Sequence, residues 1–326
     1  MMMRMGFMLA CVGMLLFSGC SLSVDVKTPT PTGQKLTQGV EKQTILSMRD
    51  SRVGEDKNLS MGKINYTLIN MENELQFLGE NIEKELQSRG INLQYQSAPG
   101  DLLLNVKKYQ IVNLRTSGFH PMWTYTMFSG DINIGGQSKT IAFYWLADKT
   151  PIWSMDEVND PCFNIPVSLM VKEVAAKLNR HYFQKRSSNA TVNQIASEID
   201  RMQKAVAGKG GDDTSAEATR NAIPLKVLEL GYTNNKTALK PLLELLDDED
   251  VFIRVAATAA IGILGEESQF NRLKTLYETK DDIEKATALK SIGDLGTAEA
   301  ISYMKKVKAS SVYQDQMFQL LVDLYI

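Results

Sequence analysis

The sequence predicts two folded parts: an α+β N-terminal domain, with a mixed or antiparallel sheet and two helices, and an all-α solenoid of repeats. Up to about residue 186, segments with strand character surround two amphipathic helical segments. From residue 216 onward, small and apolar residues recur at a regular interval. With 326 residues, the chain is long enough for two hydrophobic cores.

Residues 1–19 predict a secretory signal peptide. Arg4 is the only charged residue before an apolar run over 7–17, and Ser18 and Gly19 supply small residues at a cleavage point. The apolar run is too short to span a bilayer, which needs about 20 such residues. Cys20 follows the small residues directly.

The segment 16–20, Leu-Phe-Ser-Gly-Cys, resembles the lipobox of bacterial lipoproteins. The resemblance implies that Cys20 becomes the lipidated, palmitate-bearing first residue of the mature chain. Ser21, in place of Asp, implies export to the outer membrane, with the anchored protein facing the periplasm or exposed at the cell surface. An ordinary leader with an incidental Cys is the alternative.

Residues 20–42 predict a lipid-anchored tether. Ser, Thr, Pro, Gln and Gly dominate this segment, and its centre at 28–33 reads Thr-Pro-Thr-Pro-Thr-Gly. Such a composition cannot bury a core and favours a semi-extended chain. We expect the folded part to begin near Gln43.

Residues 43–186 predict the α+β domain. Strand patterns occur at 44–48, 91–95, 102–114, 124–134, 140–146 and 151–155, and Gly135-Gly136 suits a hairpin turn. The segment 70–89 has apolar residues at helical spacing and stops before Gly90, and Pro166 opens a second amphipathic helix. These elements predict one antiparallel-rich sheet with two helices on one face.

Three features of this domain resemble the YajG-like lipoproteins of Gram-negative envelopes. They are the Asp50-x-Arg52 pair, the helix end Ser88-Arg89-Gly90-Ile91, and the apolar strand over 101–106. That family has no settled activity, so the resemblance implies a layout and an envelope setting.

Residues 187–215 predict a helix and a Gly-rich linker between the two parts. Ile195, Ile199 and Met202 form an apolar stripe, which the glycines from Gly208 onward interrupt. A phosphate-binding loop would need a preceding strand and a closing Lys-Ser/Thr pair, and the sequence has neither here.

Residues 216–326 predict repeated helical hairpins. The segment 254–265 matches 285–296 at an offset of 31 residues, and an earlier copy matches at an offset of 34, which would place three extra residues after Gly231. Each first helix ends in Leu-Gly, because Gly readily adopts the left-handed conformation beyond a helix. The segment 312–326 resembles the first helix of an incomplete copy, so we expect the N-terminal domain, a second copy of the chain or a partner to cover it.

The combination of Arg-x-x-Ala with Leu-Gly is similar to the short bacterial form of HEAT-like repeats. The resemblance implies stacked hairpins that bury a continuous core and offer a recognition surface. A plain helical bundle is the alternative.

The sequence contains no recognisable catalytic or metal-binding constellation, so it favours a non-enzymatic role without a cofactor. His120 and His181 lack metal-ligand spacing, and we expect His181 to face solvent. Cys162 has no local base, and once the leader is removed and Cys20 is acylated it has no partner for an internal disulfide. The net charge of −2 excludes the strongly basic composition typical of nucleic-acid binding.

We therefore predict a lipid-anchored envelope scaffold or adaptor that binds another envelope protein through its HEAT-like solenoid. The alternatives are a cell-envelope enzyme and a ligand-binding or carrier lipoprotein, both acting through the α+β domain. The sequence does not indicate an oligomeric state. The candidate partner-binding residues are Arg272, Lys274, Tyr303, Lys305 and Tyr325.

Overall fold

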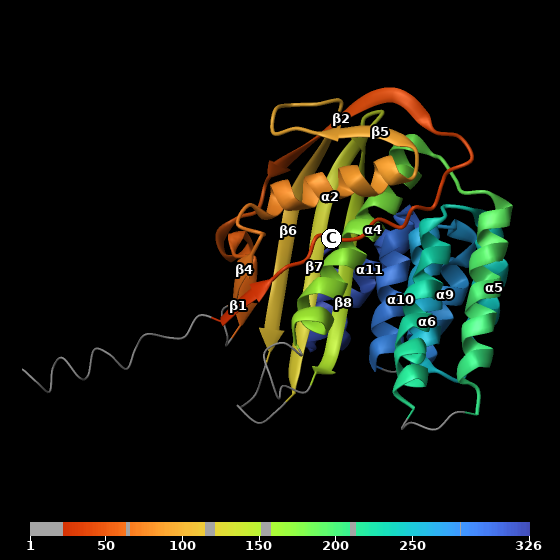
Figure 1. The fold of residues 1–326 in the computed structure, drawn as a ribbon. Helices are drawn as coiled ribbons and strands as arrows, with labels where there is room; N and C mark the ends of the chain where they lie inside the picture. Colours follow the sequence, from red (N-terminus) through yellow and green to blue (C-terminus); the bar gives the residue numbers. More distant parts are fainter. Residues whose placement is uncertain (1–21, 63–65, 115–120, 151–157, 209–212, 281) are drawn as a thin grey trace, which may run out of the picture.

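The computed structural model describes residues 22–62, 66–114, 121–150, 158–208, 213–280 and 282–326. Both predicted parts are present, an α/β domain with a mixed sheet and a C-terminal helical stretch (Figure 1). The signal peptide and Cys20, and the strand expected at 151–155, lie outside the described residues.

The sheet is mixed. Its main path has the strand order β5-β2-β6-β7-β8, and β3 (Ser60–Gly62) pairs with the far part of β6. β2 (Val40–Asp50) is parallel to both β5 (Ile91–Tyr95) and β6 (Leu102–Leu114). β6, β7 (Met122–Ile134) and β8 (Gln137–Thr150) are antiparallel. Gly135 and Gly136 both have positive φ, as a two-residue hairpin turn of this twist requires.

Two helices cover one face of the sheet, as predicted (Figure 1). In α2 (Glu74–Ser88), Leu78, Ile82 and Leu86 recur at helical spacing and are fully buried. α4 (Ile165–Leu178) follows a π-helical turn at Asn159–Asn164, and Pro166 lies in its first turn. α4 is buried around most of its circumference, because it packs on the sheet and on the helical part at once.

The N-terminal segment is not the free tether that its composition predicts. β1 (Leu22–Asp25) pairs in parallel with β4 (Tyr66–Ile69), and Val24 is fully buried. Further along, the main-chain N–H and the hydroxyl of Thr32 both donate to the buried carboxylate of Glu85 on α2, at 2.8 and 2.5 Å. The segment lacks enough apolar residues for a core of its own, but its polar groups find partners on α2. The folded part therefore begins by residue 22 and not near Gln43.

The helical part consists of hairpins in two layers. The first helices are α6 (Thr214–Tyr232), α8 (Val251–Leu264) and α10 (Asp282–Leu295), which stack side by side. The second helices are α7 (Leu239–Leu245), α9 (Phe270–Thr279) and α11 (Ala298–Lys308). The helix expected within 187–215 is α5 (Asn189–Val206), which packs along α6 and so extends this stack (Figure 1).

The repeat interval is 31 residues throughout, which corrects the offset of 34 for the earliest copy. The left-handed residues beyond the first helices are Asn234, Gly265 and Gly296, at φ of 52°, 69° and 65°. Gly231 packs against Ala260, as Gly262 packs against Ser291 one repeat later. Gly231 is thus equivalent to Gly262 and not to Gly265, and no extra residues follow it. Asn takes the left-handed position in the first copy, because its short polar side chain tolerates it.

The C-terminal segment is covered by the N-terminal domain, the first of the three expected possibilities. The hydroxyl of Ser129 on β7 donates to the carbonyl of Leu324 at 2.6 Å. α12 (Gln316–Val322) also packs against α10 and α11. Among the described residues, no helix has the length and apolar character to cross a membrane.

Candidate functional site

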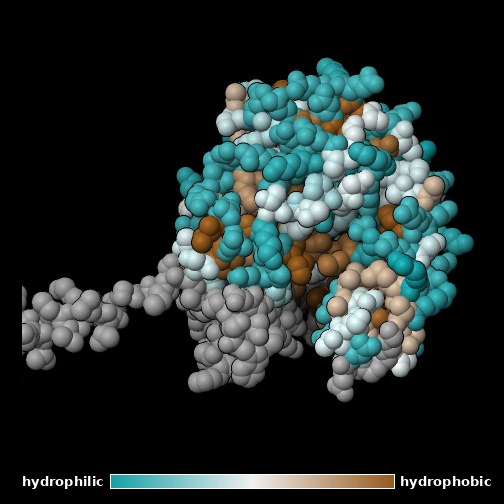
Figure 2. Space-filling model, in the orientation of Figure 1, coloured by the Kyte–Doolittle hydropathy of each residue, from teal (hydrophilic) through white to brown (hydrophobic). Residues whose placement is uncertain are grey.

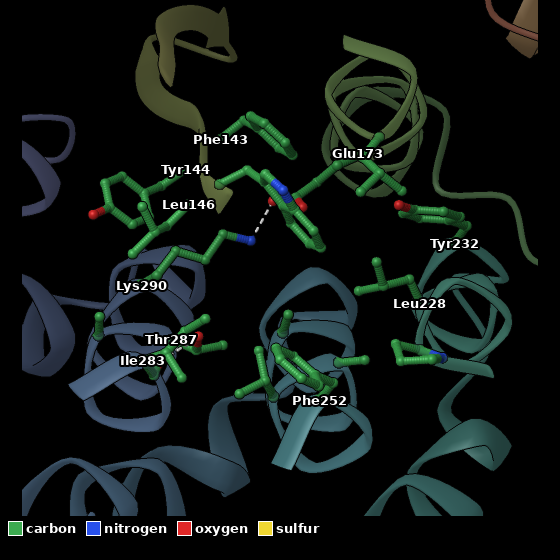
Figure 3. A pocket seen from close by; sticks show the side chains of 17 residues that line it. Phe143, Tyr144, Leu146, Glu173, Leu228, Tyr232, Phe252, Ile283, Thr287 and Lys290 are labelled. Atoms are coloured by element: carbon green, nitrogen blue, oxygen red, sulfur yellow. Dashed lines mark hydrogen bonds and ion pairs between the residues drawn. The ribbon is translucent and has the colours of Figure 1, made fainter. Parts of the chain in front are cut away.

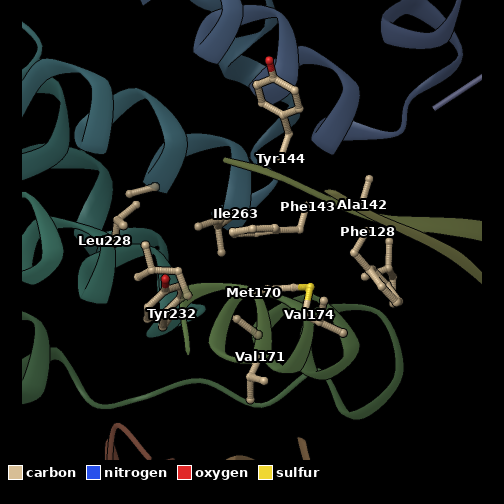
Figure 4. Close-up of a cluster of buried hydrophobic side chains, with 14 of the residues drawn as sticks. Phe128, Ala142, Phe143, Tyr144, Met170, Val171, Val174, Leu228, Tyr232 and Ile263 are labelled. Carbon is tan, nitrogen blue, oxygen red and sulfur yellow. The ribbon is translucent and has the colours of Figure 1, made fainter. Parts of the chain in front are cut away.

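The α/β domain and the solenoid share one hydrophobic core along β8 and α4. Phe143 of β8 is buried between Met170 of α4 and Ile263 of α8 (Figure 4). Tyr144, the next residue on β8, points to the opposite side of the sheet, toward the C-terminal helices (Figure 4). The helices of the C-terminal part therefore pack against side chains from both faces of the sheet at β8.

The helical turn at Asn179–Phe183, directly after α4, caps the first helices of the repeats. Arg180 Nη1 donates to the carbonyls of Gly262 and Ile263 of α8, at 3.0 and 2.7 Å, and Nη2 donates to the carbonyl of Asp294 of α10 at 2.8 Å. The last carbonyls of a helix have no partner within that helix, and a cation there also interacts favourably with the helix dipole. One guanidinium thus holds two neighbouring repeats.

The end of α6 is held by three residues of the α/β domain. Asn179 Nδ2 donates to Asn234 Oδ1 at 2.6 Å, and Asn234 Nδ2 donates to the carbonyl of Ala176 at 3.1 Å. The fully buried guanidinium of Arg89, which follows α2, donates to the carbonyl of Tyr232. The C-terminal ends of all three first helices are therefore held by side chains of the α/β domain.

Four buried charged residues, Glu173 and Lys177 of α4 with Lys290 and Asp294 of α10, form what we call the interdomain charge cluster. Lys177 Nζ contacts Glu173 at 2.6 Å and also pairs with Asp294. Lys290 Nζ contacts Asp294 at 2.8 Å and also pairs with Glu173. Two cations and two anions balance, which is the condition under which buried charges are tolerated.

The acidity of Asp294 reflects these partners. Burial alone would raise the pKa of Asp294, but the positive charges of Lys177 and Lys290 outweigh burial and hold that pKa at about 2. Burial is also the largest influence on Lys177, whose pKa it lowers. The hydroxyl of Tyr325 donates to Asp294 at 2.7 Å, so the C-terminal segment is tied into the same cluster.

An apolar groove of about 320 Å³ lies beside this cluster, between β8, α4 and the first helices (Figure 3). Its only charged lining residues among those described are Glu173 and Lys290, which neutralise each other. Phe252, at the start of α8, is 57% exposed at its rim. Figure 2 shows hydrophobic residues gathered in a hollow on this side of the molecule. The remaining lining residues are Phe143, Tyr144, Trp145, Leu146, Leu169, Pro224, Leu228, Tyr232, Val255, Ala256, Ala259, Ile283, Ala286 and Thr287.

Four of the five candidate partner-binding residues lie on the second helices, away from the groove. Arg272 and Lys305 are exposed on α9 and α11. Lys274 Nζ lies 5.9 Å from the ring centroid of Tyr303, and the Tyr303 hydroxyl donates to a carboxylate of the preceding repeat. The four residues therefore span neighbouring repeats of one layer.

Tyr325 does not belong with these four. Its ring is 7% exposed and stacks against Gly293 of α10, and its hydroxyl is engaged by Asp294. The prediction that Tyr325 contacts a partner is corrected, because the aromatic end of the chain completes the protein's own core.

Two of the remaining sequence candidates, His181 and Cys162, are partly or fully buried. His181 does not face solvent freely: it is partly buried, its Nε2 lies 3.0 Å from Arg180 Nη2, and burial followed by the neighbouring positive charges lowers its pKa to about 3. The thiol of Cys162 is buried. His120 lies outside the described residues. Within the described ranges, no group of three or more His, Cys, Asp or Glu side chains is arranged to hold a metal ion.

Comparison with known proteins assigns part of the chain. A family model for HEAT repeats matches residues 213–293, in agreement with the repeat interpretation. No curated protein matches the chain. One solved structure, titled "Crystal structure of uncharacterized protein", is 14% identical with a TM-score of 0.29, over 48% of this chain and 95% of its own.

Proposed function

We propose that this protein is a lipid-anchored envelope scaffold that binds another protein through its HEAT-like solenoid. The observation that carries the proposal is the arrangement of the repeats: the first helices are committed to the α/β domain, whereas the second helices carry exposed charged side chains beside the half-buried Tyr303. Stacked repeats offer extended surfaces of this kind, and recognition is their usual use.

The proposed anchor is a lipid on Cys20 at the outer membrane, with the protein facing the periplasm. The lipobox-like segment and the resemblance to YajG-like lipoproteins support this address. Because β1 begins at Leu22, an anchor at Cys20 would hold the folded body close to the lipid surface and not at the end of a long tether.

The anchor is tested by metabolic labelling with an alkynyl fatty acid. The full chain should incorporate the label and sediment with outer-membrane vesicles, and Cys20→Ala should lose both properties. Labelling of the Cys20→Ala variant at the wild-type level would reject the anchor site.

The partner surface is tested by cross-linking the mature protein in detergent-solubilised envelopes. Charge reversal at Arg272, Lys274 and Lys305, combined with Tyr303→Ala, should abolish a specific cross-linked species. Lys204→Glu on α5 is the matched control, since Lys204 is exposed and, within the described part of the chain, pairs with Asp200 of its own helix. Surface variants are preferable to deleting the solenoid, because deletion would expose the buried faces of α4 and β8. A cross-link that survives the combined substitution would contradict this surface.

A further inference from the structure

The groove lies against the free edge of β8. β8 ends the path of the main sheet, and within the described residues its strand partner is β7. The four consecutive residues from Phe143 to Leu146 all line the groove. Because successive side chains of a strand point to opposite faces, a cavity that touches four in a row faces the edge of the strand. Figure 3 shows Phe143 pointing to one side of the strand and Tyr144 and Leu146 to the other.

The pairing pattern fixes which main-chain groups point toward β7. The N–H of Ile111 on β6 donates to the carbonyl of Leu59, on the side away from β7. Ile111 and its cross-strand neighbour Thr126 are therefore a non-hydrogen-bonded pair. Thr126 directs its N–H and C=O away from β6 and toward β8, where its cross-strand neighbour is Trp145. Antiparallel strands alternate between hydrogen-bonded and non-bonded pairs. Trp145 and, two residues earlier, Phe143 thus bond to β7.

The residues of β8 that alternate with Phe143 and Trp145 direct their main-chain N–H and C=O groups away from β7. Ala142 confirms this direction, because its carbonyl accepts from Lys177 Nζ of α4 at 2.6 Å. Beyond Ala142, Tyr144 and Leu146 direct their N–H and C=O groups to the edge that faces the groove. No described residue donates to or accepts from these groups on that side. The groove is therefore walled by apolar side chains but has a row of open main-chain donors and acceptors along one side.

We propose that the groove receives an extended segment of a partner protein, which pairs with β8 as an added strand. Such a segment can satisfy both N–H and both C=O groups of Tyr144 and Leu146 and bury apolar side chains against α6, α8 and α10. An acyl chain would fill the apolar space but leave the main-chain groups without partners. A helix would also leave them unpaired, since it bonds its own main chain.

The charge of the groove defines the segment further. Lys290 and Glu173 at its closed end already neutralise each other, so no free charge remains there for a chain terminus. The segment is consequently an internal, uncharged stretch with alternating apolar residues. This inference rests on the proposed interaction function but concerns a second surface, separate from the second helices.

The experiment selects binders from a displayed library of random linear peptides on the full mature protein. We expect enriched peptides with apolar residues at alternate positions, whose affinity is then measured by fluorescence polarisation. Leu146→Pro removes one groove-facing N–H without touching the β7 ladder and should weaken binding about tenfold or more, whereas Leu146→Val should not. Ala259→Trp fills the groove and should also prevent binding, and Ala205→Trp on the exposed face of α5 is the matched control.

Ester-for-amide substitution in the best peptide gives a test on the unaltered protein. Esters at one set of alternate residues should weaken binding about tenfold, and esters at the other set should not, because only one edge of the added strand faces β8. Equal effects of the two sets would overturn the proposal, as would the absence of any enriched peptide. Binding of cis-parinaric acid that Ala259→Trp abolishes, with no enriched peptide, would assign the groove to a lipid. A dimer that Leu146→Pro dissolves would assign it to a second copy of the chain.

The two proposals fail separately. If a cross-linked partner depends on the second helices but not on Leu146 or Ala259, the scaffold function stands and the strand-addition site falls. If peptides bind the groove but no envelope protein is captured by either surface, the site stands and the scaffold function falls.

Discussion

Removing the carboxylate of Asp294 should unbalance the interdomain charge cluster. Asp294→Ala removes an acceptor shared by Lys177, Lys290 and the hydroxyl of Tyr325. Two buried cations would then share one anion, Glu173. Breaking a buried pair by removing one partner typically costs about 3–5 kcal/mol. We expect the free energy of unfolding to fall by that amount.

The pKa of Asp294 gives a second measure of how much its ionised carboxylate stabilises the folded state. Its pKa of about 2 lies below the ordinary value of 3.8, a difference worth roughly 2 kcal/mol in favour of the folded state. Since the pKa is lowered on folding, this contribution is complete above about pH 4 and is lost as the pH falls toward 2. The alanine variant should lose this part of the acid sensitivity, because the titrating group is gone.

The assay is urea unfolding at pH 7, with a double-mutant cycle. Lys177→Met combined with Asp294→Ala leaves Lys290 paired with Glu173 and restores neutrality, so the double variant should be more stable than the sum of the two single effects by about 2 kcal/mol. Asp200→Ala removes an exposed pair with Lys204 and should change stability by less than about 1 kcal/mol. Additive single effects, or a cost for Asp294→Ala no larger than that control, would refute the reasoning.

Three further predictions follow from contacts elsewhere. Arg180→Ala should lower the free energy of unfolding by about 3 kcal/mol, because it removes charge-assisted hydrogen bonds to two helix ends, and Arg180→Lys should recover only part; a wild-type urea midpoint would contradict this. Gly262→Ala places a Cβ 2.7 Å from the Cα of Ser291 and should cost about 1–3 kcal/mol by thermal unfolding, whereas Ser302→Ala on the exposed face of α11 should be neutral. Glu85→Ala removes both hydrogen bonds to Thr32 and should speed thermolysin cleavage within 26–39 about tenfold, measured by mass spectrometry; unchanged cleavage would show that other contacts hold the segment.

The elements that local pattern specifies were predictable from the sequence. The strands at 91–95 and 102–114 have the predicted bounds, and the helix expected at 70–89 is α2 over Glu74–Ser88. These segments combine a clear apolar period with Gly or capping residues at their ends. The HEAT-like repeats were recognisable for the same reason, because each copy repeats a complete local pattern.

The repeat interval and the N-terminal segment show where local pattern misleads. The recurrence of Leu-Gly at 230–231 suggests an equivalent of Leu264-Gly265, but Asn234 takes the left-handed position that Gly265 occupies one repeat later. The Thr-Pro-rich segment is typical of a mobile linker, yet it is ordered by a buried carboxylate on α2. In the first case Asn234 takes the left-handed position where the sequence rules expect Gly. In the second, hydrogen bonds to the carboxylate of Glu85 order a segment that has too few apolar residues to be ordered by burial.

The interdomain charge cluster and the groove could not be predicted, because no single segment contains them. Glu173 with Lys177, and Lys290 with Asp294, are ordinary pairs four residues apart, of the kind that usually decorates a solvated helix face. Only the docking of α4 on α10 brings the two pairs together and buries them. The groove likewise needs residues from β8, α4 and three repeats.

The position of the groove follows from where the solenoid is fastened. Arg180, Asn179 and Arg89 hold the C-terminal ends of α6, α8 and α10, and the interdomain charge cluster lies close to that end of α10. The groove opens toward the other end of the helices, where Phe252 begins α8. Among the described residues, no comparable polar contacts with the α/β domain lie at that end, where the groove runs beside the edge of β8. A hydrogen-bonded junction at one end and an open strand edge toward the other are therefore two features of the same docking arrangement.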